Sequence, residues 1–240
     1  MITKLYKYVV GLVMSLLMAS PAYSQYSVGS VGLLNTPSAE MNDGGVVMLG
    51  ANYLPVAMTP SSWDYNTANY FASITFLPFL EVGLRFTLLE LDTGQWNQDR
   101  SISLKLRLLK ERSWLPSLVV GSNDLLTTDN LNPLEETTTN RYFSSIFAVM
   151  TKNFDVGFGE VGVTVGGYLP IEKKQTSIGV FGGVTFSPEF YKNVKVIAEY
   201  NNSDVNLGLA FKFFNHLSLY GFAYDMKTFA GGLRYEIDLY

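Results

Sequence analysis

Hydrophobic and polar residues alternate along several segments of the chain. In residues 101–108 every even-numbered residue is isoleucine or leucine, and every odd-numbered residue is serine, lysine or arginine. Residues 205–213 and 233–239 repeat the pattern, with an apolar residue at each odd-numbered position. A period of two places successive side chains on opposite faces of a β-strand, whereas a helical period of 3.6 would mix the two sets. We therefore predict strands with one apolar and one polar face.

Over the whole chain the alternation predicts about twelve strands, each close to the 9–11 residues that a tilted membrane-spanning strand needs. Their expected positions are near residues 45–54, 68–77, 79–89, 100–109, 114–122, 141–151, 153–168, 177–187, 193–200, 204–213, 216–224 and 228–239. Pro116 interrupts the fifth. The seventh is expected to contain a β-bulge, because its alternation changes phase near Phe158.

The connections between these segments alternate in length. Long polar stretches follow the first, third and fifth predicted strands, whereas short turns follow the second, fourth, sixth and tenth, at Pro78, 110–113, Lys152 and 214–215. Outer-membrane barrels have short periplasmic turns and longer outer loops. The pattern therefore predicts an all-β fold, a single antiparallel up-and-down transmembrane β-barrel over residues 45–240.

The apolar face of these strands is expected to point outward. A soluble sandwich or ligand-binding barrel also alternates, but about twelve strands enclose a lumen that apolar side chains cannot easily fill. Aromatic residues also gather near the predicted strand ends, where a membrane barrel carries interfacial girdles, although aromatic residues are enriched in strands generally. The candidates for these girdles are Tyr53, Tyr70, Phe79, Trp114, Tyr142, Phe154, Tyr168, Tyr200, Tyr224 and Phe229.

The N-terminal residues differ from the rest of the chain. Lys4 and Lys7 precede the apolar run 9–19, and the small residues Ala22 and Ser24 follow it. This arrangement predicts a secretory signal peptide over residues 1–24, cleaved after Ser24; a retained anchor is the alternative. Residues 25–44 are rich in Gly, Ser and Asn, and form either a periplasmic lead or a small plug in the lumen.

Composition narrows the classes of function. The 240 residues contain 17 basic and 21 acidic side chains, which argues against nucleic-acid binding. The absence of cysteine excludes disulfides, thiolate metal sites and a lipidated cysteine within these residues. Charged residues make up 16% of the chain, below the roughly 25% of soluble domains, and there are 16 Phe and 15 Tyr, so the composition favours a membrane protein.

The polar face of the predicted strands carries most of the charge that would line the lumen. The candidate lumen-lining residues are Glu81, Arg85, Lys105, Arg107, Lys195, Glu199, Lys212, Arg234, Glu236 and Asp238. They would contact a hydrophilic polymer or a plugging segment, or form a paired network that fills the lumen, which we favour. Glu81 and Arg85 share one face of one strand, and we predict an internal ion pair between them.

Catalytic and metal sites are not expected. The single histidine, His216, lies in a predicted short turn without a serine or carboxylate motif around it. The acidic residues Asp124, Asp129, Glu135 and Glu136 do not have the spacing of a calcium-binding loop. We therefore expect no enzyme activity, no cofactor and no bound metal.

Several segments resemble YjbH-like outer-membrane proteins, which are associated with exopolysaccharide and capsule production. Residues 32–41, followed by Gly44 and Gly45, are similar to the opening motif of that family, and residues 77–87 are similar to its "lPwlEvGfRYt" segment. Residues 103–110, 116–124 and 198–200 resemble later blocks in the same order. Many members of the family are several times longer than this chain.

The resemblance implies a non-enzymatic barrel in the outer membrane that takes part in secretion or surface assembly of an exopolysaccharide. The alternatives are a small diffusion pore or structural outer-membrane protein and, third, a lipid-modifying barrel enzyme. Expected partners are outer-membrane lipid, exopolysaccharide, periplasmic export proteins and the barrel assembly machinery, with the protein itself a monomer.

Overall fold

A computed structural model describes residues 25–91, 94–127, 143–171 and 179–239, so the predicted signal peptide lies outside the described residues. Within them it has twelve strands and two short 3₁₀ helices, η1 (Val56–Met58) and η2 (Glu189–Tyr191). The strands are β1 (Val46–Leu54), β2 (Thr67–Leu77), β3 (Leu80–Glu90), β4 (Trp96–Leu109), β5 (Ser117–Thr127), β6 (Ser145–Asp155), β7 (Gly159–Pro170), β8 (Gly179–Pro188), β9 (Val194–Asn201), β10 (Asp204–Phe213), β11 (Leu217–Tyr224) and β12 (Thr228–Asp238). No helix in the described ranges has the length and apolar character needed to cross a membrane.

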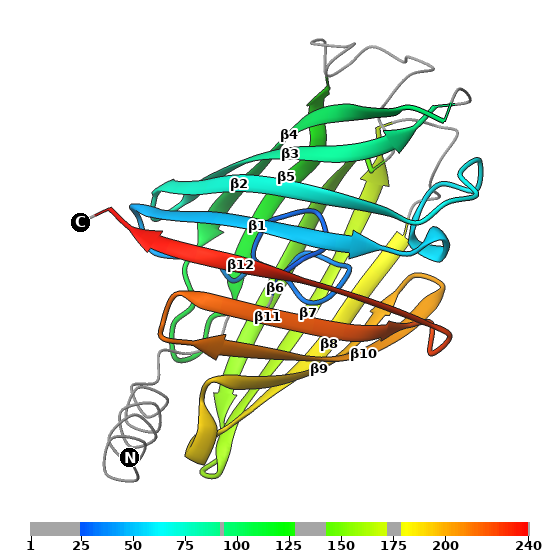
Figure 1. Cartoon of the computed structure of the whole chain (residues 1–240). Helices are drawn as coiled ribbons and strands as arrows, with labels where there is room; N and C mark the ends of the chain where they lie inside the picture. Colours follow the sequence, from blue (N-terminus) through cyan, green and yellow to red (C-terminus); the bar gives the residue numbers. More distant parts are fainter. Residues whose placement is uncertain (1–24, 92–93, 128–142, 172–178, 240) are drawn as a thin grey trace, which may run out of the picture.

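The strands form one closed antiparallel barrel. Each strand pairs with its neighbours in sequence, and β12 closes the sheet on β1, with Val46 opposite Asp238 and Tyr53 opposite Gly231 (Figure 1). Because neighbours in sequence are neighbours in the sheet, the barrel has the up-and-down connectivity that the alternating pattern predicts. The all-β, twelve-stranded antiparallel barrel is confirmed.

The turn between β6 and β7 is not at the predicted position. β6 continues through Lys152 to Asp155, and the chain turns over residues 156–158. Gly157 has φ +82°, a left-handed conformation that glycine adopts without steric cost, and its N–H donates to the Asp155 carboxylate at 2.8 Å. The alternation in the sequence does not reveal this turn, because apolar residues continue through it.

The predicted β-bulge also lies elsewhere. β7 pairs with β6 and β8 without a shift in register, so the phase change near Phe158 marks the turn rather than a bulge. The register shifts occur in the β2–β3 pair and, twice, in the β4–β5 pair. Pro116 precedes β5, whose N-terminal boundary is Ser117, and therefore interrupts no strand.

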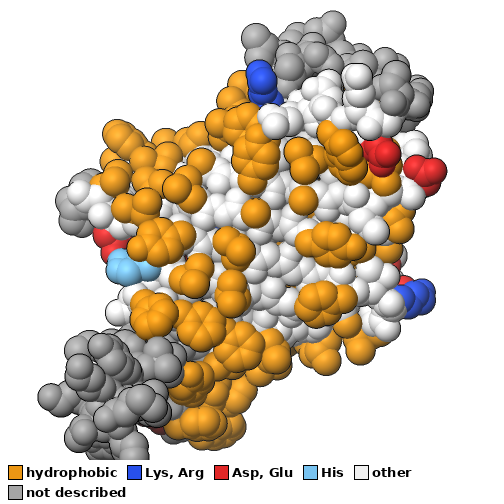
Figure 2. Space-filling model, viewed as in Figure 1, with side chains coloured by type: hydrophobic (Ala, Val, Ile, Leu, Met, Phe, Trp, Pro, Cys, Tyr) orange, Lys and Arg blue, Asp and Glu red, His pale blue; other side chains and the backbone are white. Residues whose placement is uncertain are grey.

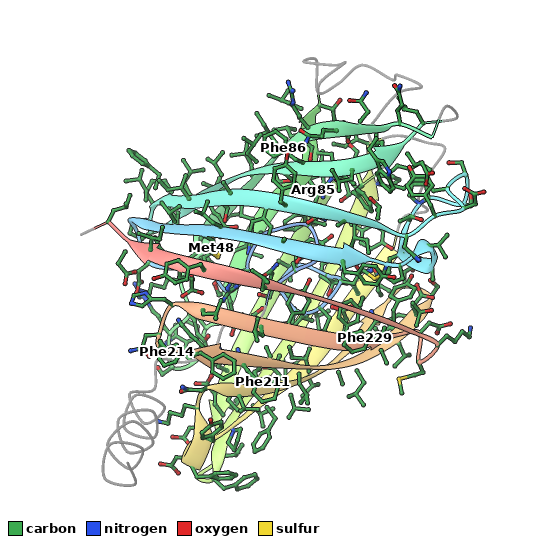
Figure 3. The ribbon with its side chains drawn as sticks, in the orientation of Figure 1. Met48, Arg85, Phe86, Phe211, Phe214 and Phe229 are labelled. Atoms are coloured by element: carbon green, nitrogen blue, oxygen red, sulfur yellow. The ribbon has the colours of Figure 1, made fainter. Side chains whose placement is uncertain are left out.

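The two faces of the barrel wall have opposite polarity. On β10, the outward Val205 and Leu207 are 52% and 48% exposed, whereas the inward Asn206 is fully buried. Apolar side chains are spread over the visible outer surface, whereas charged side chains lie at its margins, and Phe211 and Phe229 lie on the outer side (Figures 2 and 3). The outward apolar face expected from the sequence is therefore present along these strands.

Two of the aromatic residues assigned to girdles point inward instead. Tyr168 stacks on Phe181 with ring centroids 5.9 Å apart, inside the barrel, and Tyr224 packs against a buried inner cluster. Tyr142 lies outside the described residues. The other seven candidates are 40% or more exposed: Tyr53, Tyr70, Phe79, Trp114, Phe154, Tyr200 and Phe229.

Residues 25–44, which we call the plug, lie inside the barrel (Figure 1). Val31, Leu34 and Ala39 are fully buried, and the plug folds back on itself through β-bridges between Gln25 and Val31 and between residues 32 and 37. It leads through Gly45 into β1. Of the two arrangements that the sequence left open for this segment, the structure has the one inside the lumen.

Candidate functional site

Residues 32–36, which we call the tip of the plug, are bound by one carboxylate of the barrel wall. Glu199, on β9, accepts hydrogen bonds from the backbone N–H groups of Leu34, Asn35 and Thr36 at 2.9–3.0 Å, and from the Thr36 hydroxyl at 2.8 Å. The Asn206 amide, on β10, donates to the same carboxylate at 2.7 Å. Successive N–H groups that converge on an anion form a concave anion-binding nest. Glu199 is 2% exposed, so its charge is satisfied largely by the plug.

The tip requires glycine at position 32. A Cβ atom on Gly32 would lie 2.5 Å from the Cβ atom of Tyr26 and 2.7 Å from the carbonyl oxygen of Thr36, closer than real Cβ contacts. The carbonyl oxygen of Thr36 in turn accepts a hydrogen bond from the N–H of Leu33 at 2.9 Å. Glycine therefore allows the tight loop that directs three N–H groups toward Glu199.

Cations from β4 bind the carbonyl groups of the plug. Lys105 Nζ donates to the carbonyl oxygens of Val31 and Glu40 at 2.8 and 2.9 Å, and Arg107 Nη2 donates to that of Met41 at 3.0 Å. Lys105 is 3% exposed, whereas Arg107 is half-buried. The wall charges are thus complementary to the backbone groups that they bind: the carboxylate binds N–H groups, and the cations bind carbonyl oxygens.

The same part of the plug also contacts the facing strands. Ala39 donates its N–H to the Thr151 hydroxyl at 2.9 Å, and its carbonyl oxygen accepts from the Ser117 hydroxyl at 3.1 Å. The Glu40 carboxylate forms an ion pair with Lys195 Nζ at 3.2 Å, and both side chains are at most 9% exposed. These contacts hold residues 39–40 between opposite walls of the barrel.

The predicted ion pair between Glu81 and Arg85 is wrong. Arg85 Nη2 instead pairs with the Asp124 carboxylate on β5 at 2.5 Å, and its guanidinium lies 4.7 Å from the centroid of the Phe143 ring. Residues four apart on a strand are separated by about 13 Å along it, beyond the reach of a direct pair. Glu81 lies opposite Lys105 of β4, the nearest strand neighbour that carries an opposite charge. Figure 3 shows Arg85 on β3.

A third group of charges lies on β10 and β12. The Glu236 carboxylate accepts a hydrogen bond from Lys212 Nζ at 2.8 Å and forms an ion pair with Arg234 Nη2, 2.7 Å away. Asp238, by contrast, is exposed at the end of β12 and does not line the lumen. Of the ten candidate lumen-lining residues, eight are buried, Arg107 is half-buried and Asp238 is exposed.

Uncharged polar residues of the inner wall also contact the plug, and they were not among the lumen-lining residues predicted from the sequence. Asn52 Nδ2 donates to the carbonyl oxygen of Ser27 at 2.9 Å, and its Oδ1 accepts from the Tyr220 hydroxyl at 2.9 Å. Asn123 Nδ2 donates to the Tyr26 hydroxyl at 3.2 Å, and burial raises the pKa of Tyr26. Asn52 and Asn123 lie on the inward face of their strands, and the alternation of the sequence could have identified them. They were left out because only charged residues were chosen as candidates.

A cavity of about 570 Å³ opens at the end of the barrel that carries the short turns. Plug residues 39–41 and Asp43 form one side, and strands β4 to β9 with their turns form the other. His216 is outside this lining, in the turn after β10, where its Nδ1 lies 3.1 Å from the carbonyl oxygen of Glu236. In the described ranges no group of three or more His, Cys, Asp or Glu side chains has the geometry of a metal site.

Fold and site together define a closed β-barrel whose charged lumen is occupied by its own N-terminal segment. The chain belongs to the YjbH family: the family model, described as "Exopolysaccharide biosynthesis protein YbjH", matches residues 24–216. One relative is the "Uncharacterized lipoprotein YjbH" of Escherichia coli (strain K12), 35% identical over 114 residues. The match covers 42% of this chain and 14% of that protein.

Three of the segments that resemble the family meet at the plug. Residues 32–41 form its tip and the stretch held between the walls, residues 103–110 carry its cationic ligands, and residues 198–200 carry Glu199. The resemblance therefore coincides with contacts between the plug and the wall.

Proposed function

We propose that this protein is a monomeric outer-membrane β-barrel that acts without catalysis in the secretion or surface assembly of an exopolysaccharide. The observation that carries the proposal is the reversed polarity of the barrel, with Leu207 and Leu209 exposed outside and Arg85 and Arg234 buried inside. Apolar surface that faces water on every strand is unfavourable, whereas lipid tails solvate it. Family membership supports the link to exopolysaccharide.

The proposed orientation places the short turns in the periplasm. These turns connect β2 to β3, β4 to β5 and β6 to β7, while the longer β1–β2 connection, residues 55–66, is at the opposite end. Residues 1–24 act as the cleavable signal peptide, and the assembly machinery inserts the barrel. The relative is named a lipoprotein, and these 240 residues contain no cysteine. In this proposal the outward apolar side chains of the barrel wall contact the lipid.

The occupied lumen favours a role in export or assembly over that of a freely open pore. The plug is held by Glu199, Lys105 and Lys195, each buried and each in contact with it. We propose that the protein works with periplasmic export proteins on the polymer and that the plug closes the barrel at rest.

The proposal is tested by measuring surface exopolysaccharide in a strain that lacks the gene and in the same strain complemented with the full chain. Membrane fractionation and heat-modifiable gel mobility are measured on the same cells. We expect loss of polymer on deletion, restoration on complementation, and a heat-modifiable protein in the outer-membrane fraction. Unchanged polymer would reject the exopolysaccharide role, and a soluble protein would reject the membrane assignment.

A matched pair of variants separates insertion in lipid from folding alone. Leu209→Arg places a charge on the outward face of β10, where the lipid-facing cost is about 2–4 kcal/mol near the bilayer midplane. Ser203→Arg places the same charge in the exposed β9–β10 turn and serves as the control. We expect Leu209→Arg to lower stability in vesicles and Ser203→Arg to leave it unchanged; equal stability of the two variants would contradict a lipid-facing wall.

A further inference from the structure

We propose that the cavity at the short-turn end of the barrel binds a short segment of a hydroxyl-rich saccharide. The inference deepens the proposed function, because it assigns a site to the polymer. The cavity has a volume of about 570 Å³, within the roughly 300–1,000 Å³ of pockets for small ligands. It therefore has room for a few sugar rings rather than for a folded partner.

Most of the residues that line the cavity have polar side chains. Of the 17 lining residues, 14 carry a charged, amide or hydroxyl side chain; the exceptions are Ala39, Met41 and Gly159. Protein interfaces are centred on aromatic and other apolar anchors, and none of the described residues that line this cavity is aromatic. Hydrogen-bond donors and acceptors all around the wall suit a ligand whose surface is covered with hydroxyl groups.

The charges are mixed, with six acidic and four basic residues in the lining. An anionic ligand such as a phosphate would meet an excess of carboxylates, and the described residues offer no metal cluster. Lys110 and Lys192 are both exposed at the mouth, where their ammonium groups are available to donate to sugar hydroxyls. The balance of charge therefore favours a saccharide over an anion or a cation.

Part of the wall is already fixed in position. The Glu111 carboxylate accepts hydrogen bonds from Lys152 Nζ at 2.7 Å and from the Asn153 N–H and amide at 2.9 Å each. The Asn153 side-chain oxygen is buried and accepts no hydrogen bond from the described residues. That oxygen has almost no accessible surface, so the preorganised acceptor that a sugar hydroxyl could reach on this side is the Glu111 carboxylate, which is 27% exposed and lines the cavity.

The side of the cavity that faces Glu111 and Asn153 is formed by the plug. Glu40 is held there by its ion pair with Lys195, and both residues belong to the lining. A saccharide in the cavity would therefore contact the wall and the plug at once, at the end of the barrel that we place in the periplasm.

The test uses the full-length protein in detergent and fragments from partial hydrolysis of the exopolysaccharide shed by the strain that carries the gene. Binding is measured by calorimetry for the native protein, for Ser187→Trp and for Val184→Trp. Ser187 lines the cavity, whereas Val184 lies on the same strand with an outward, 48% exposed side chain. We expect the first substitution to weaken binding about tenfold or more by filling the cavity, and the second to leave it unchanged.

A second variant guards against misfolding of Ser187→Trp. The exposed pair Lys110→Ala and Lys192→Ala removes two donors without touching the packed wall, and we expect about threefold weaker binding. No binding by the native protein, or equal binding by the two tryptophan variants, would overturn the saccharide site. If either result is found but the polymer still disappears on gene deletion, the saccharide site is rejected and the proposed function is kept. If the protein binds the fragments but gene deletion leaves the polymer unchanged, the proposed function is rejected and the site is kept.

Discussion

The buried charges of this barrel fall into two groups, which differ in where their partners lie. Glu199 and Lys105 find their partners in the backbone of the plug, whereas Arg85 pairs with Asp124, and Lys212 with Glu236, inside the wall. A buried charge without a partner costs several kcal/mol. The first group therefore depends on the plug, and the second group does not.

Because the first group binds backbone groups of the plug, the inner wall is not simply a network of ion pairs. Glu199 binds N–H groups and Lys105 binds carbonyl oxygens, so each wall charge selects the complementary backbone dipole. Side chains of the plug contribute less, with Glu40 to Lys195 as a pair between charged groups. The wall is thus fitted to a conformation of the plug more than to its side-chain charges, and four predictions test this division.

Removal of residues 26–42 is expected to have the largest effect. The deletion takes away the buried Val31, Leu34 and Ala39 together with every backbone partner of Glu199 and Lys105. We expect an open lumen, measured as ion conductance in planar bilayers. We also expect the barrel to unfold at a lower temperature, measured as the temperature at which its gel mobility changes on heating. A deletion variant as closed and as stable as the native protein would show that the plug is not what occupies the lumen.

Glu199→Ala is expected to destabilise the native protein by about 4 kcal/mol, because it leaves the N–H groups of residues 34–36 and the Asn206 amide without an acceptor. Urea unfolding in vesicles gives the change, and hydrogen exchange at Leu34 to Thr36 should accelerate. Glu199→Gln keeps one acceptor oxygen and should lose less. Glu160→Ala, at an exposed carboxylate, is the control.

In the plug deletion, the cost of Glu199→Ala should largely vanish, since the N–H groups that bind the carboxylate are absent. An undiminished cost in that background would place the partner of Glu199 in the wall and would break the comparison.

Arg85→Met is expected to cost about 3 kcal/mol, because the fully buried Asp124 carboxylate loses its counter-ion. A double-mutant cycle with Asp124→Leu should give a clear coupling energy, whereas a cycle of Arg85→Met with Glu81→Leu should give almost none. The Arg85–Asp124 coupling should persist in the plug deletion. A coupling that disappears with the plug would move this pair into the first group.

Lys105→Met is expected to have the smallest effect, about 2 kcal/mol, since the two groups that lose a charged donor are uncharged carbonyl groups. Unfolding midpoints of Lys105→Met and of Lys110→Met, an exposed lysine beyond the same strand, make the comparison. Equal midpoints would mean that the carbonyl contacts of Lys105 contribute nothing to stability.

The strands were predictable because their signal is local. In residues 101–108 and 205–213 the alternation of side chains has a period of two, and β4 and β10 follow it. The β6–β7 turn was misplaced because Gly157, the residue that permits it, lies within a stretch that remains apolar on both sides. A turn set by one left-handed residue gives a weaker signal than a periodic strand.

The sequence by itself determined the number of strands, their two faces and most of the inward charges, because alternation along a strand fixes which side each residue occupies. It wrongly included Asp238, and it left out the buried Asp124, because the fifth strand was predicted to end at residue 122 whereas β5 continues to Thr127. Only the tertiary structure decided the partners of those charges. Arg85 meets Asp124, and Glu199 meets Leu34 from 165 residues away, only after the barrel closes and the plug folds inside it. Spacing along one strand gives a face, but distance across a closed sheet depends on register and on what fills the lumen.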